Sequence, residues 1–293
     1  MAPLVTVAMS VHNGASTLGP AVRSLLWQTF TEWELLVIND ASTDDTLHIC
    51  RQFQDSRIQV IDEPQQRGLA ARLNQCVDRA RGKYMARMDA DDVAYPERFL
   101  RQVEYLESHP EIDLLGHGAV LFRGDGEIIG LYPMAECHED ICRRPWWGFP
   151  LAHPTWMGKR SWFLKHRYDE TLTKAQDQDL LLRTWRTSRF ACLPECLLGY
   201  RLENVSVSKS VHGRWAYCRR LLVQAKDIPS AVCALRGIGV HTVALARDLM
   251  LDLTGVVGRR VRQSYIAADL TAKEQWRSIW DRVSADQPSC VHV

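Results

Sequence analysis

The stretch Gly82-Lys83-Tyr84-Met85-Ala86-Arg87-Met88-Asp89-Ala90-Asp91-Asp92 runs a mostly apolar segment directly into three carboxylates. A short apolar run of this kind predicts a buried strand over residues 83–89 that ends at a site. Because residues two apart on a strand point to the same side, we expect Asp89 and Asp91 to project together. Asp92 is then expected to begin the following turn.

This acidic end has two interpretations. Close carboxylates suit a hard cation such as Mg²⁺ or Mn²⁺, which proteins hold with one or two carboxylates together with phosphate oxygens of a substrate. The same residues could instead form a solvated acidic turn that caps a helix near Tyr95. The pattern Asp-x-Asp does not decide between them, because it is short and arises often by chance.

Apolar runs and helix-forming stretches alternate before this point. The sequence predicts strands over residues 4–11, 34–39 and 57–62, and helices over residues 18–28, 46–54 and 68–81. Such spacing predicts right-handed parallel β-α-β units, whose ligands collect at the carboxyl ends of the strands. The segments Ser10 to Asn13, Asp40, and Asp89 to Asp91 all follow predicted strands, so we expect three loops to meet in one crevice.

Composition limits the class of protein. The chain has 293 residues, of which 46% are hydrophobic, so it can form one sizeable core with an appendage. The net charge of +1 is unevenly spread, because residues 209–293 hold 13 Lys and Arg against 7 Asp and Glu. This basic tail indicates either contact with an anionic surface or a solvated basic helix face. We expect no nucleic-acid partner.

The cysteines and apolar runs indicate a cytoplasmic protein. Nine scattered cysteines are an odd number and form no compact framework, so free thiols and a reducing compartment are expected. The close pairs Cys137/Cys142 and Cys192/Cys196 lack the matched partners of a zinc site. The first residues lack the features of a signal peptide, and no uninterrupted apolar run reaches the ~18 residues that a membrane span needs.

Several motifs together resemble the family 2 glycosyltransferases, which have the GT-A fold. They cover about two thirds of the chain, and their occurrence together in this order is more specific than any single motif. The resembling segments are Val5 to Asn13, Gln28-Thr29-Phe30, Glu34 to Asp44, Arg72-Leu73-Asn74, Gly82 to Asp92, His153-Pro154-Thr155, Asp177 to Leu180, and Tyr200-Arg201.

The resemblance implies a fold and an activity. The fold would be α/β of the GT-A type, with a Rossmann-like nucleotide-binding half that has a mostly parallel sheet, an acceptor-binding half and a helical C-terminal segment. We therefore expect a catalytic domain over residues 1–208 and a helical, basic extension over residues 209–293. The activity would be transfer of a sugar, with inversion, from a nucleotide-sugar, usually a UDP-sugar, to a hydroxyl of a saccharide or lipid-linked acceptor. Mn²⁺ or Mg²⁺ would be the cofactor, and cell-surface polysaccharide synthesis the setting.

The resemblance also implies residues that bind the nucleotide. Ser10, His12 and Asp40 match contacts to the base and ribose, and Arg72 matches a further contact on that side. Each has a simpler alternative on local grounds. Asp40 could cap the helix that follows its strand, and His12 could be an ordinary loop histidine.

The metal and the catalytic base are implied in the same way. Asp89 is similar to the family's carboxylate on the ribose or metal side, and Asp91 matches the one that holds the metal on the diphosphate. Asp177 falls on the catalytic aspartate of a Glu-Asp pair, although Gln176 replaces the glutamate here. Asp177 and Asp179 could instead only stabilise the start of a helix through its dipole.

The middle of the chain is less regular. A strand is predicted over residues 112–122, followed by a hairpin turn at Gly124-Asp125-Gly126 and a second strand over residues 127–132. Trp146 and Trp147 beside two arginines could stack on a sugar and hold a phosphate. We favour a packing role for them, because large aromatic side chains chiefly contribute buried area.

Beyond residue 210 the sequence predicts helices over residues 215–225 and 241–257. In the second helix one apolar stripe contains Val243, Ala246, Leu249 or Met250, Leu253 and Val256, with His241 and Arg247 toward the other side. Docking of this stripe on the core is the favoured interpretation. The cluster Arg259-Arg260-Val261-Arg262 supports the alternative, in which the segment lies on an anionic membrane surface and the protein is peripheral to the inner face of the cell membrane.

Two other classes of function remain open. The pattern Asp89-x-Asp91-x-Val93 superficially fits a haloacid-dehalogenase phosphatase, but that motif closes the first strand and here it follows the fourth. A non-catalytic nucleotide-sugar-binding or scaffold protein is suggested by Gln176 and by Glu203 or Asn204, which stand where a histidine often occurs. We therefore assign no metal ligand at these two positions.

Overall fold

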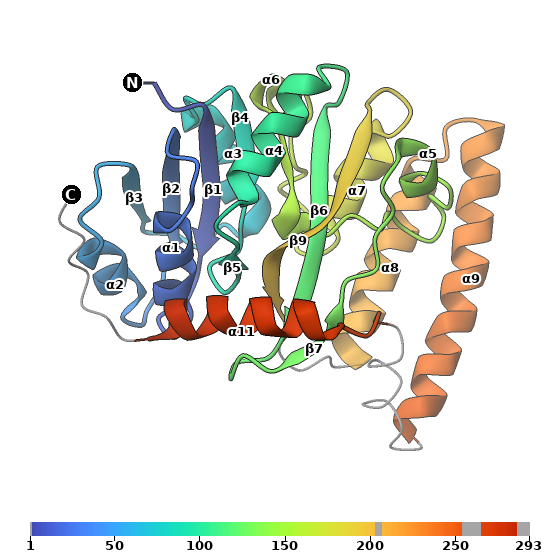
Figure 1. The fold of residues 1–293 in the computed structure, drawn as a ribbon. Helices are drawn as coiled ribbons and strands as arrows, with labels where there is room; N and C mark the ends of the chain where they lie inside the picture. Colours follow the sequence, from blue (N-terminus) through green and yellow to red (C-terminus); the bar gives the residue numbers. More distant parts are fainter. Residues whose placement is uncertain (1, 203–206, 254–264, 286–293) are drawn as a thin grey trace.

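A computed structural model describes residues 2–202, 207–253 and 265–285 (Figure 1). Its first part alternates strands and helices as the sequence predicts. The elements are β1 (Val5–Val11), α1 (Leu18–Leu26), β2 (Trp33–Asp40), α2 (Thr46–Gln52), β3 (Ile58–Glu63), α3 (Leu69–Arg79) and β4 (Tyr84–Arg87). Strands β1, β2, β3 and β4 pair in parallel, which places their carboxyl ends at one edge of the sheet.

The second part extends the same sheet. It adds β5 (Val93–Ala94), β6 (Leu114–Phe122), β7 (Ile128–Leu131), β8 (Met157–Lys159) and β9 (Phe190–Arg201). The strand order is β3-β2-β1-β4-β8-β6-β9-β5, with β7 paired to β6. The short strand β8 is antiparallel to both β4 and β6 and joins the two halves. The sheet is therefore parallel over β1 to β4 and mixed beyond it.

Strand β4 ends earlier than predicted. It stops at Arg87, so Asp89 and Asp91 do not lie on a strand, and the expectation that strand periodicity aligns them is wrong. The chain turns here instead, with a backbone hydrogen bond of 3.4 Å from Asp92 N to Asp89 O. Gly82 allows β4 to begin close to β1, because a Cβ atom at this position would lie 2.6 Å from Thr6 N.

The helices cover both faces and one end of the sheet. Those of the second part are α4 (Arg98–Ser108), α5 (His138–Ile141), η1 (His153–Thr155), α6 (Arg160–Lys165), α7 (Gln176–Thr184), α8 (Val207–Val223), α9 (Ile228–Leu253) and α11 (Leu270–Ser284). Helices α8 and α9 pack side by side next to α7 (Figure 1). The eight described cysteines are all free thiols, as expected.

The C-terminal segment is not uniform in its packing. Helix α11 crosses one end of the sheet and packs against α1 (Figure 1). Its residues Trp276, Ile279 and Val283 are buried in the main hydrophobic core. The Trp276 ring lies where a side chain at Gly199 would otherwise be, and its Nε1 donates to Gly126 O at 2.7 Å. The last helix therefore belongs to the core of the molecule, while the division at residue 208 stays a prediction.

Helix α9 has the opposite orientation to the predicted one. Val243 and Met250 are 71% and 67% exposed, whereas His241 is buried toward α8, so the prediction that the apolar stripe docks on the core is wrong for these positions. Ala246 is exposed as well. The side chains of Leu249, Leu253 and Val256 and the cluster at residues 259–262 lie outside the described residues.

The same helix is long and apolar enough to cross a membrane. The 20-residue segment Ile228–Arg247 has a mean hydropathy of 1.4, and 22% of this window is buried. The prediction that no segment reaches this length is wrong by this measure, because an average over a helix tolerates single charges such as Arg236. Length and composition alone do not distinguish a membrane helix from other apolar helices.

We predict that Trp276→Ala will lower the free energy of unfolding by about 3–5 kcal/mol, because it removes a large buried ring from a packed core. Urea unfolding followed by circular dichroism measures this change. Trp215→Ala is the matched control, since Trp215 is exposed, and should change stability by less than about 0.5 kcal/mol. Equal stabilities of the two variants would show that α11 does not hold the core together.

Candidate active site

The end of β2 and the start of α3 are joined by a buried ion pair. Arg72 Nε lies 2.6 Å from Asp40 Oδ1, and both side chains are almost fully buried. The other Asp40 oxygen accepts from Gly68 N at 2.8 Å, and Oδ1 also accepts from Arg67 N at 2.9 Å. Asp40 therefore does not cap α2, the helix after its strand. It fixes the loop that leads into α3.

The electrostatics of this pair favour the charged carboxylate. Burial by itself would raise the pKa of Asp40, but the hydrogen bonds from Arg67 N, the Arg72 side chain and Gly68 N outweigh it and hold the pKa below its usual value. Arg72 also lies 3.2 Å from Glu63, at the end of β3. The Arg72 side chain is thus held between the ends of β2 and β3.

The two predicted residues of the first strand lie beside this pair. Ser10 is in β1, opposite Ile38 of β2. His12 follows the strand, and its Nδ1 lies 2.8 Å from Asp40 O. The structure brings His12, Asp40 and Arg72 together at the carboxyl ends of parallel strands, where the sequence places them.

Three residues in left-handed backbone conformation occur next to the candidate site. Asn13, Ala41 and Ala175 have φ angles of 53°, 57° and 57°, and they are the non-glycine residues with positive φ in the described part of the chain. This conformation is costly for a residue with a Cβ atom, above all for alanine. Its occurrence after β1, after β2 and at the start of α7 indicates that these loops are held in place by their surroundings.

The three aspartates after β4 form a compact cluster. Single carboxylate oxygens of Asp89, Asp91 and Asp92 all lie within 4.8 Å of one another. Arg87 contacts this cluster from the end of β4, where it is buried and forms an ion pair with Asp89. Burial alone would lower the pKa of Arg87, but the charges of Asp89 and Asp92 outweigh it and raise this pKa. Arg98 and Arg201 are also buried, and their charges act on Asp92 and Asp91 respectively.

Burial and mutual repulsion perturb the carboxylates. Burial and the neighbouring Asp89 raise the pKa of Asp91 to about 6. Burial, Asp89 and Asp91 raise that of Asp92 well above its usual value. The Oδ2 atom of Asp92 is buried and has no hydrogen-bond partner in the described part of the chain. Crowded oxygen ligands with an unsatisfied buried atom fit a divalent cation, which would relieve the repulsion.

The turn is anchored from the other half of the molecule. Arg201, at the end of β9, donates from its backbone N to Asp92 Oδ1 and from Nε to Asp91 O, both at 2.9 Å. Arg98 of α4 donates to Arg87 O at 2.7 Å and to Pro154 O at 2.9 Å. The position of the cluster therefore depends on β9 and α4 as well as on β4. Glu203 and Asn204 lie outside the described residues.

Asp177 and Asp179 have different surroundings at the start of α7. Asp179 is fully buried and pairs with Arg183 Nε at 2.8 Å and Arg220 Nε at 2.6 Å, which links α7 to α8. Asp177 is half-buried and pairs with no cation within the described ranges. Its contact is Gln178, whose Nε2 lies 3.4 Å from Asp177 Oδ2. Asp179 is thus committed to structure, whereas the Asp177 carboxylate is available.

The environment of Asp177 connects it to the acidic cluster. Burial raises the pKa of Asp177, and hydrogen bonds from Gln178 and the positive charge of Arg87 oppose this shift. Arg87 therefore acts electrostatically on Asp89, Asp92 and Asp177 at once. Sequence reasoning missed this role of Arg87, although an arginine inside a run of buried residues was a usable signal, since buried arginines are nearly always paired.

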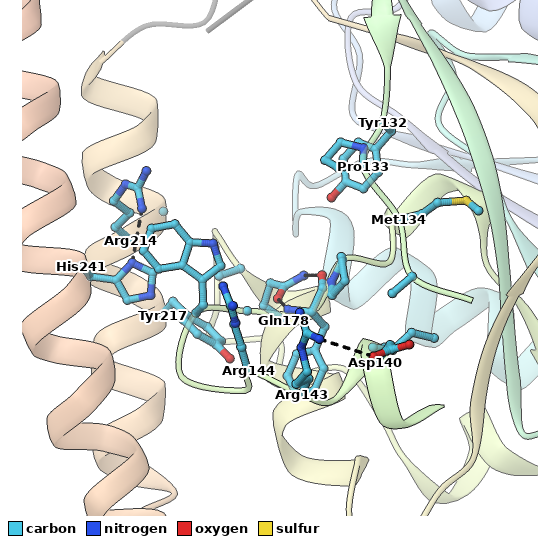
Figure 2. Close-up of a pocket in the computed structure, with 18 of the residues that line it drawn as sticks. Tyr132, Pro133, Met134, Asp140, Arg143, Arg144, Gln178, Arg214, Tyr217 and His241 are labelled. Carbon is cyan, nitrogen blue, oxygen red and sulfur yellow. Dashed lines mark hydrogen bonds and ion pairs between the residues drawn. The ribbon is translucent and has the colours of Figure 1, made fainter. Parts of the chain in front are cut away.

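A large pocket opens beside Gln178, the residue after Asp177 (Figure 2). Its volume is about 1110 Å³, and Ala175 and Gln178 of the α7 start line it together with residues 132–137, 143–144 and 147–150 and with residues of α8 and α9. Gln178 fastens the loop before η1 to α7, since its Oε1 accepts from Phe149 N at 2.8 Å and its Nε2 donates to Phe149 O at 3.2 Å. The sequence did not predict this pocket, because α8 and α9 complete its wall from far along the chain.

The paired tryptophans face the C-terminal helices. The guanidinium of Arg236 lies 4.6 Å from the ring centroid of Trp146. Trp147 is 47% exposed, lines the pocket and stacks on His241 with ring centroids 5.3 Å apart and an angle of 4° between the planes. The favoured packing role fits Trp146 better than Trp147, whose ring is available to the pocket.

Comparison with known proteins identifies the family. A model described as glycosyl transferase family 2 matches residues 6–167. The chain therefore belongs to glycosyl transferase family 2, as the motifs predicted. Two relatives support this assignment. EpsE from Bacillus subtilis (strain 168), whose own glycosyltransferase assignment is provisional, is 40% identical over 187 residues, which are 62% of this chain and 66% of EpsE. The O-antigen biosynthesis glycosyltransferase WbnJ from Escherichia coli is 32% identical over 218 residues, which are 71% of this chain and 83% of WbnJ.

Solved structures confirm the GT-A fold. S. aureus TarS in complex with UDP-GlcNAc has a TM-score of 0.65 at 16% identity, over 97% of this chain and 80% of that one. The mannosyltransferase PcManGT from Pyrobaculum calidifontis, in complex with GDP-Man and Mn²⁺, has a TM-score of 0.61 at 15% identity, over 98% of this chain and 88% of that one. Membership of the family makes the protein a glycosyltransferase and leaves the phosphatase interpretation without support.

Proposed function

We propose that this glycosyltransferase moves a sugar, with inversion and with the help of a divalent cation, from a UDP-sugar to an acceptor hydroxyl. The observation that carries this proposal is the arrangement around Arg87. Its side chain pairs with Asp89, and its charge also acts on the carboxylates of Asp92 and Asp177. The donor diphosphate, through its cation, would use the carboxylates after β4, and the acceptor hydroxyl would use Asp177.

The nucleotide would bind at the ends of β1 and β2. Ser10, His12, Asp40 and Arg72 are the residues that we assign to the base and ribose. Asp40 and Arg72 are already fixed by their ion pair and by the hydrogen bonds from Arg67 N and Gly68 N. Such preorganisation lowers the entropy cost of binding. The complexes of TarS with UDP and UDP-GlcNAc support UDP as the nucleotide.

Asp91, with Asp89, would hold Mn²⁺ or Mg²⁺ against the donor diphosphate, and Arg87 would keep Asp89 in position. When bound, the cation supplies positive charge that neutralises the leaving nucleoside diphosphate. The Mn²⁺ complex of PcManGT supports this choice of cofactor. Asp92 is held by Arg201 and would chiefly shape the turn.

Asp177 would act as the general base. It would accept the proton of the acceptor hydroxyl while the hydroxyl oxygen forms a bond to the anomeric carbon and the bond to the diphosphate breaks. One displacement of this kind inverts the anomeric centre. The raised pKa of Asp177 suits a base, because a carboxylate of ordinary pKa is a poor proton acceptor near neutral pH.

We predict that Asp177→Asn will lower turnover by about 10²- to 10⁴-fold, or roughly 3–5 kcal/mol, because asparagine cannot accept the proton. Nucleotide release from UDP-sugar in the presence of acceptor measures turnover, and calorimetry measures donor affinity. Donor affinity and melting temperature should barely change.

Asp179→Asn is the comparison variant for this experiment. Because it leaves Arg183 and Arg220 without their buried carboxylate, we expect it to act on stability, by about 3–5 kcal/mol, more than on the turnover of the folded fraction. Retention of more than about a tenth of normal turnover by Asp177→Asn would remove Asp177 as the base.

A further prediction concerns the cation. Asp91→Asn should greatly weaken the binding of UDP-sugar in the presence of Mn²⁺ while leaving the fold intact, because it removes a metal ligand. Thermal shift is the measurement, since a ligand at a hundred times its Kd adds about 2.7 kcal/mol of stability. Asp125→Asn, in the exposed β6–β7 turn, is the matched control. An unchanged Mn²⁺-dependent shift in Asp91→Asn would take Asp91 out of the metal site.

The acceptor side faces the C-terminal helices, and we propose that these helices rest on a membrane surface. Exposed apolar residues lie along the outer face of α9, at intervals of four, three, eight and seven positions that keep them on one side of a helix: Ile228, Val232, Leu235, Val243 and Met250. Trp215 of α8 is also exposed, with Arg219 stacked over it at 6.0 Å. Apolar faces bordered by aromatic and cationic side chains are typical of helices at the membrane interface. The protein would then be cytoplasmic and peripheral, and would act on a saccharide or lipid-linked acceptor in cell-surface polysaccharide synthesis.

We predict that the full-length protein sediments with vesicles that contain phosphatidylglycerol and that Leu235→Gln/Val243→Gln binds them at least tenfold more weakly. Each substitution removes an apolar side chain whose burial contributes about 1.5–3 kcal/mol. Leu164→Gln, an exposed leucine of α6, is the control and should bind as the unmodified protein does. Protein that stays in the supernatant at both low and physiological salt would contradict the proposal.

A further inference from the structure

The pocket beside Gln178 carries an excess of positive charge. Four cationic residues line it against two carboxylates: Arg143, Arg144, Lys174 and Arg214 against Glu136 and Asp140. Arg143 lies 3.8 Å from Asp140, so one pair is partly neutralised. Arg144 and Lys174 are exposed and form no ion pair within the described ranges of the chain. The pocket lining therefore contains two cations, Arg144 and Lys174, that no described carboxylate neutralises.

Trp147 and His241 form an aromatic wall of the same pocket. The Trp147 ring stacks on His241, and the Arg214 guanidinium lies 5.5 Å from the Trp147 ring centroid. Figure 2 shows Arg143 and Arg144 next to Gln178, with Arg214 and His241 toward the C-terminal helices. Burial and the charge of Arg214 lower the pKa of His241, so the wall gains no charge from its imidazole at neutral pH. The wall offers a flat ring beside fixed cations.

The pocket is connected directly to the proposed base. Gln178 lines it and contacts Asp177 Oδ2, while its hydrogen bonds with Phe149 hold the loop that follows Arg143 and Arg144. On the other side, Tyr217 of α8 donates to Pro145 O at 2.5 Å and fixes the same loop to α8. The loop that carries Arg143 and Arg144 is thus tied through Gln178 to the residue next to the proposed base.

We infer that this pocket binds a phosphate group of the acceptor through Arg144 and Lys174, with Arg143 and Arg214 beside them. The inference rests on the proposed function, since it concerns the second substrate of that same site. Charge-assisted hydrogen bonds from arginine to phosphate are among the strongest that proteins make, and an uncharged saccharide would give these cations no partner. A volume of about 1110 Å³ accommodates a sugar together with its phosphate groups.

Two sources of phosphate share this chemistry, a prenyl diphosphate lipid and a soluble sugar phosphate. Calorimetric titration of the full-length protein with inorganic pyrophosphate, in EDTA, tests the pocket alone. Without a cation the three aspartates after β4 repel phosphate, so binding must come from elsewhere. We expect Arg144→Gln/Lys174→Gln to weaken pyrophosphate binding at least tenfold. Arg123→Gln/Lys165→Gln removes the same charge from two exposed positions outside the pocket and should bind as the unmodified protein does.

Farnesyl diphosphate and farnesol, used below their micelle concentrations, separate the two sources. Tighter binding of farnesyl diphosphate than of pyrophosphate, lost in Arg144→Gln/Lys174→Gln while farnesol binding persists, supports a lipid diphosphate. Equal binding of farnesyl diphosphate and pyrophosphate supports a soluble phosphate ester.

Pyrophosphate affinity that is the same in both double variants would overturn the inference, as would no binding at all to the unmodified protein. None of these titrations depends on turnover. Loss of the pocket's phosphate affinity and loss of transfer in Asp177→Asn are therefore separate results.

Discussion

The arrangement of the active site depends on one buried charge. Arg87 lies at the end of β4, and its guanidinium is almost fully buried. It forms an ion pair with the carboxylate of Asp89. Burial of an arginine is costly unless carboxylates compensate it, and burial of three carboxylates is costly unless a cation does. The buried guanidinium and the buried carboxylates therefore each lower the cost of burying the other. Even with Arg98 and Arg201 nearby, burial and mutual repulsion raise the pKa values of Asp91 and Asp92, and a divalent cation would relieve this repulsion.

The two halves of the molecule meet at this charge. Arg98 of α4 holds the Arg87 backbone to Pro154 of η1, and Arg201 of β9 holds the turn that carries the aspartates. The insertion of β8 between β4 and β6 brings η1 beside the end of β4. A parallel sheet alone would place the loops after β1 and β2, but the acidic turn is also positioned by α4, which follows it at once, and by η1 and β9, which come much later in the chain.

The elements that the sequence predicted are those with local signals. The first three β-α units follow periodicity and turn residues, and the grouping of His12, Asp40 and Arg72 follows from parallel strands. The end of β4 at Arg87 was missed, because the turn after it is held by Arg201 in a distant strand. The pocket was missed because α8 and α9 complete it, and a tertiary contact between a loop and distant helices leaves no local pattern.

Helix α9 has a recognisable apolar stripe in its sequence, but the prediction that this stripe packs on the core is wrong. The described residues of its predicted stripe, Val243, Ala246 and Met250, face outward, while His241 turns inward to stack on Trp147. Periodicity identifies which residues share a face and does not identify what covers that face. The inward face is small and polar here because it closes a pocket instead of filling a core.

Anomalous X-ray diffraction from crystals grown with UDP and Mn²⁺ tests the central claim most directly, because it locates the cation independently of activity. The account predicts one manganese peak within bonding distance of the Asp91 carboxylate and of the UDP diphosphate, with Arg87 still paired to Asp89. A diphosphate bound in the same crevice directly by Arg87 or Arg201, with no manganese peak among the three aspartates, would contradict it.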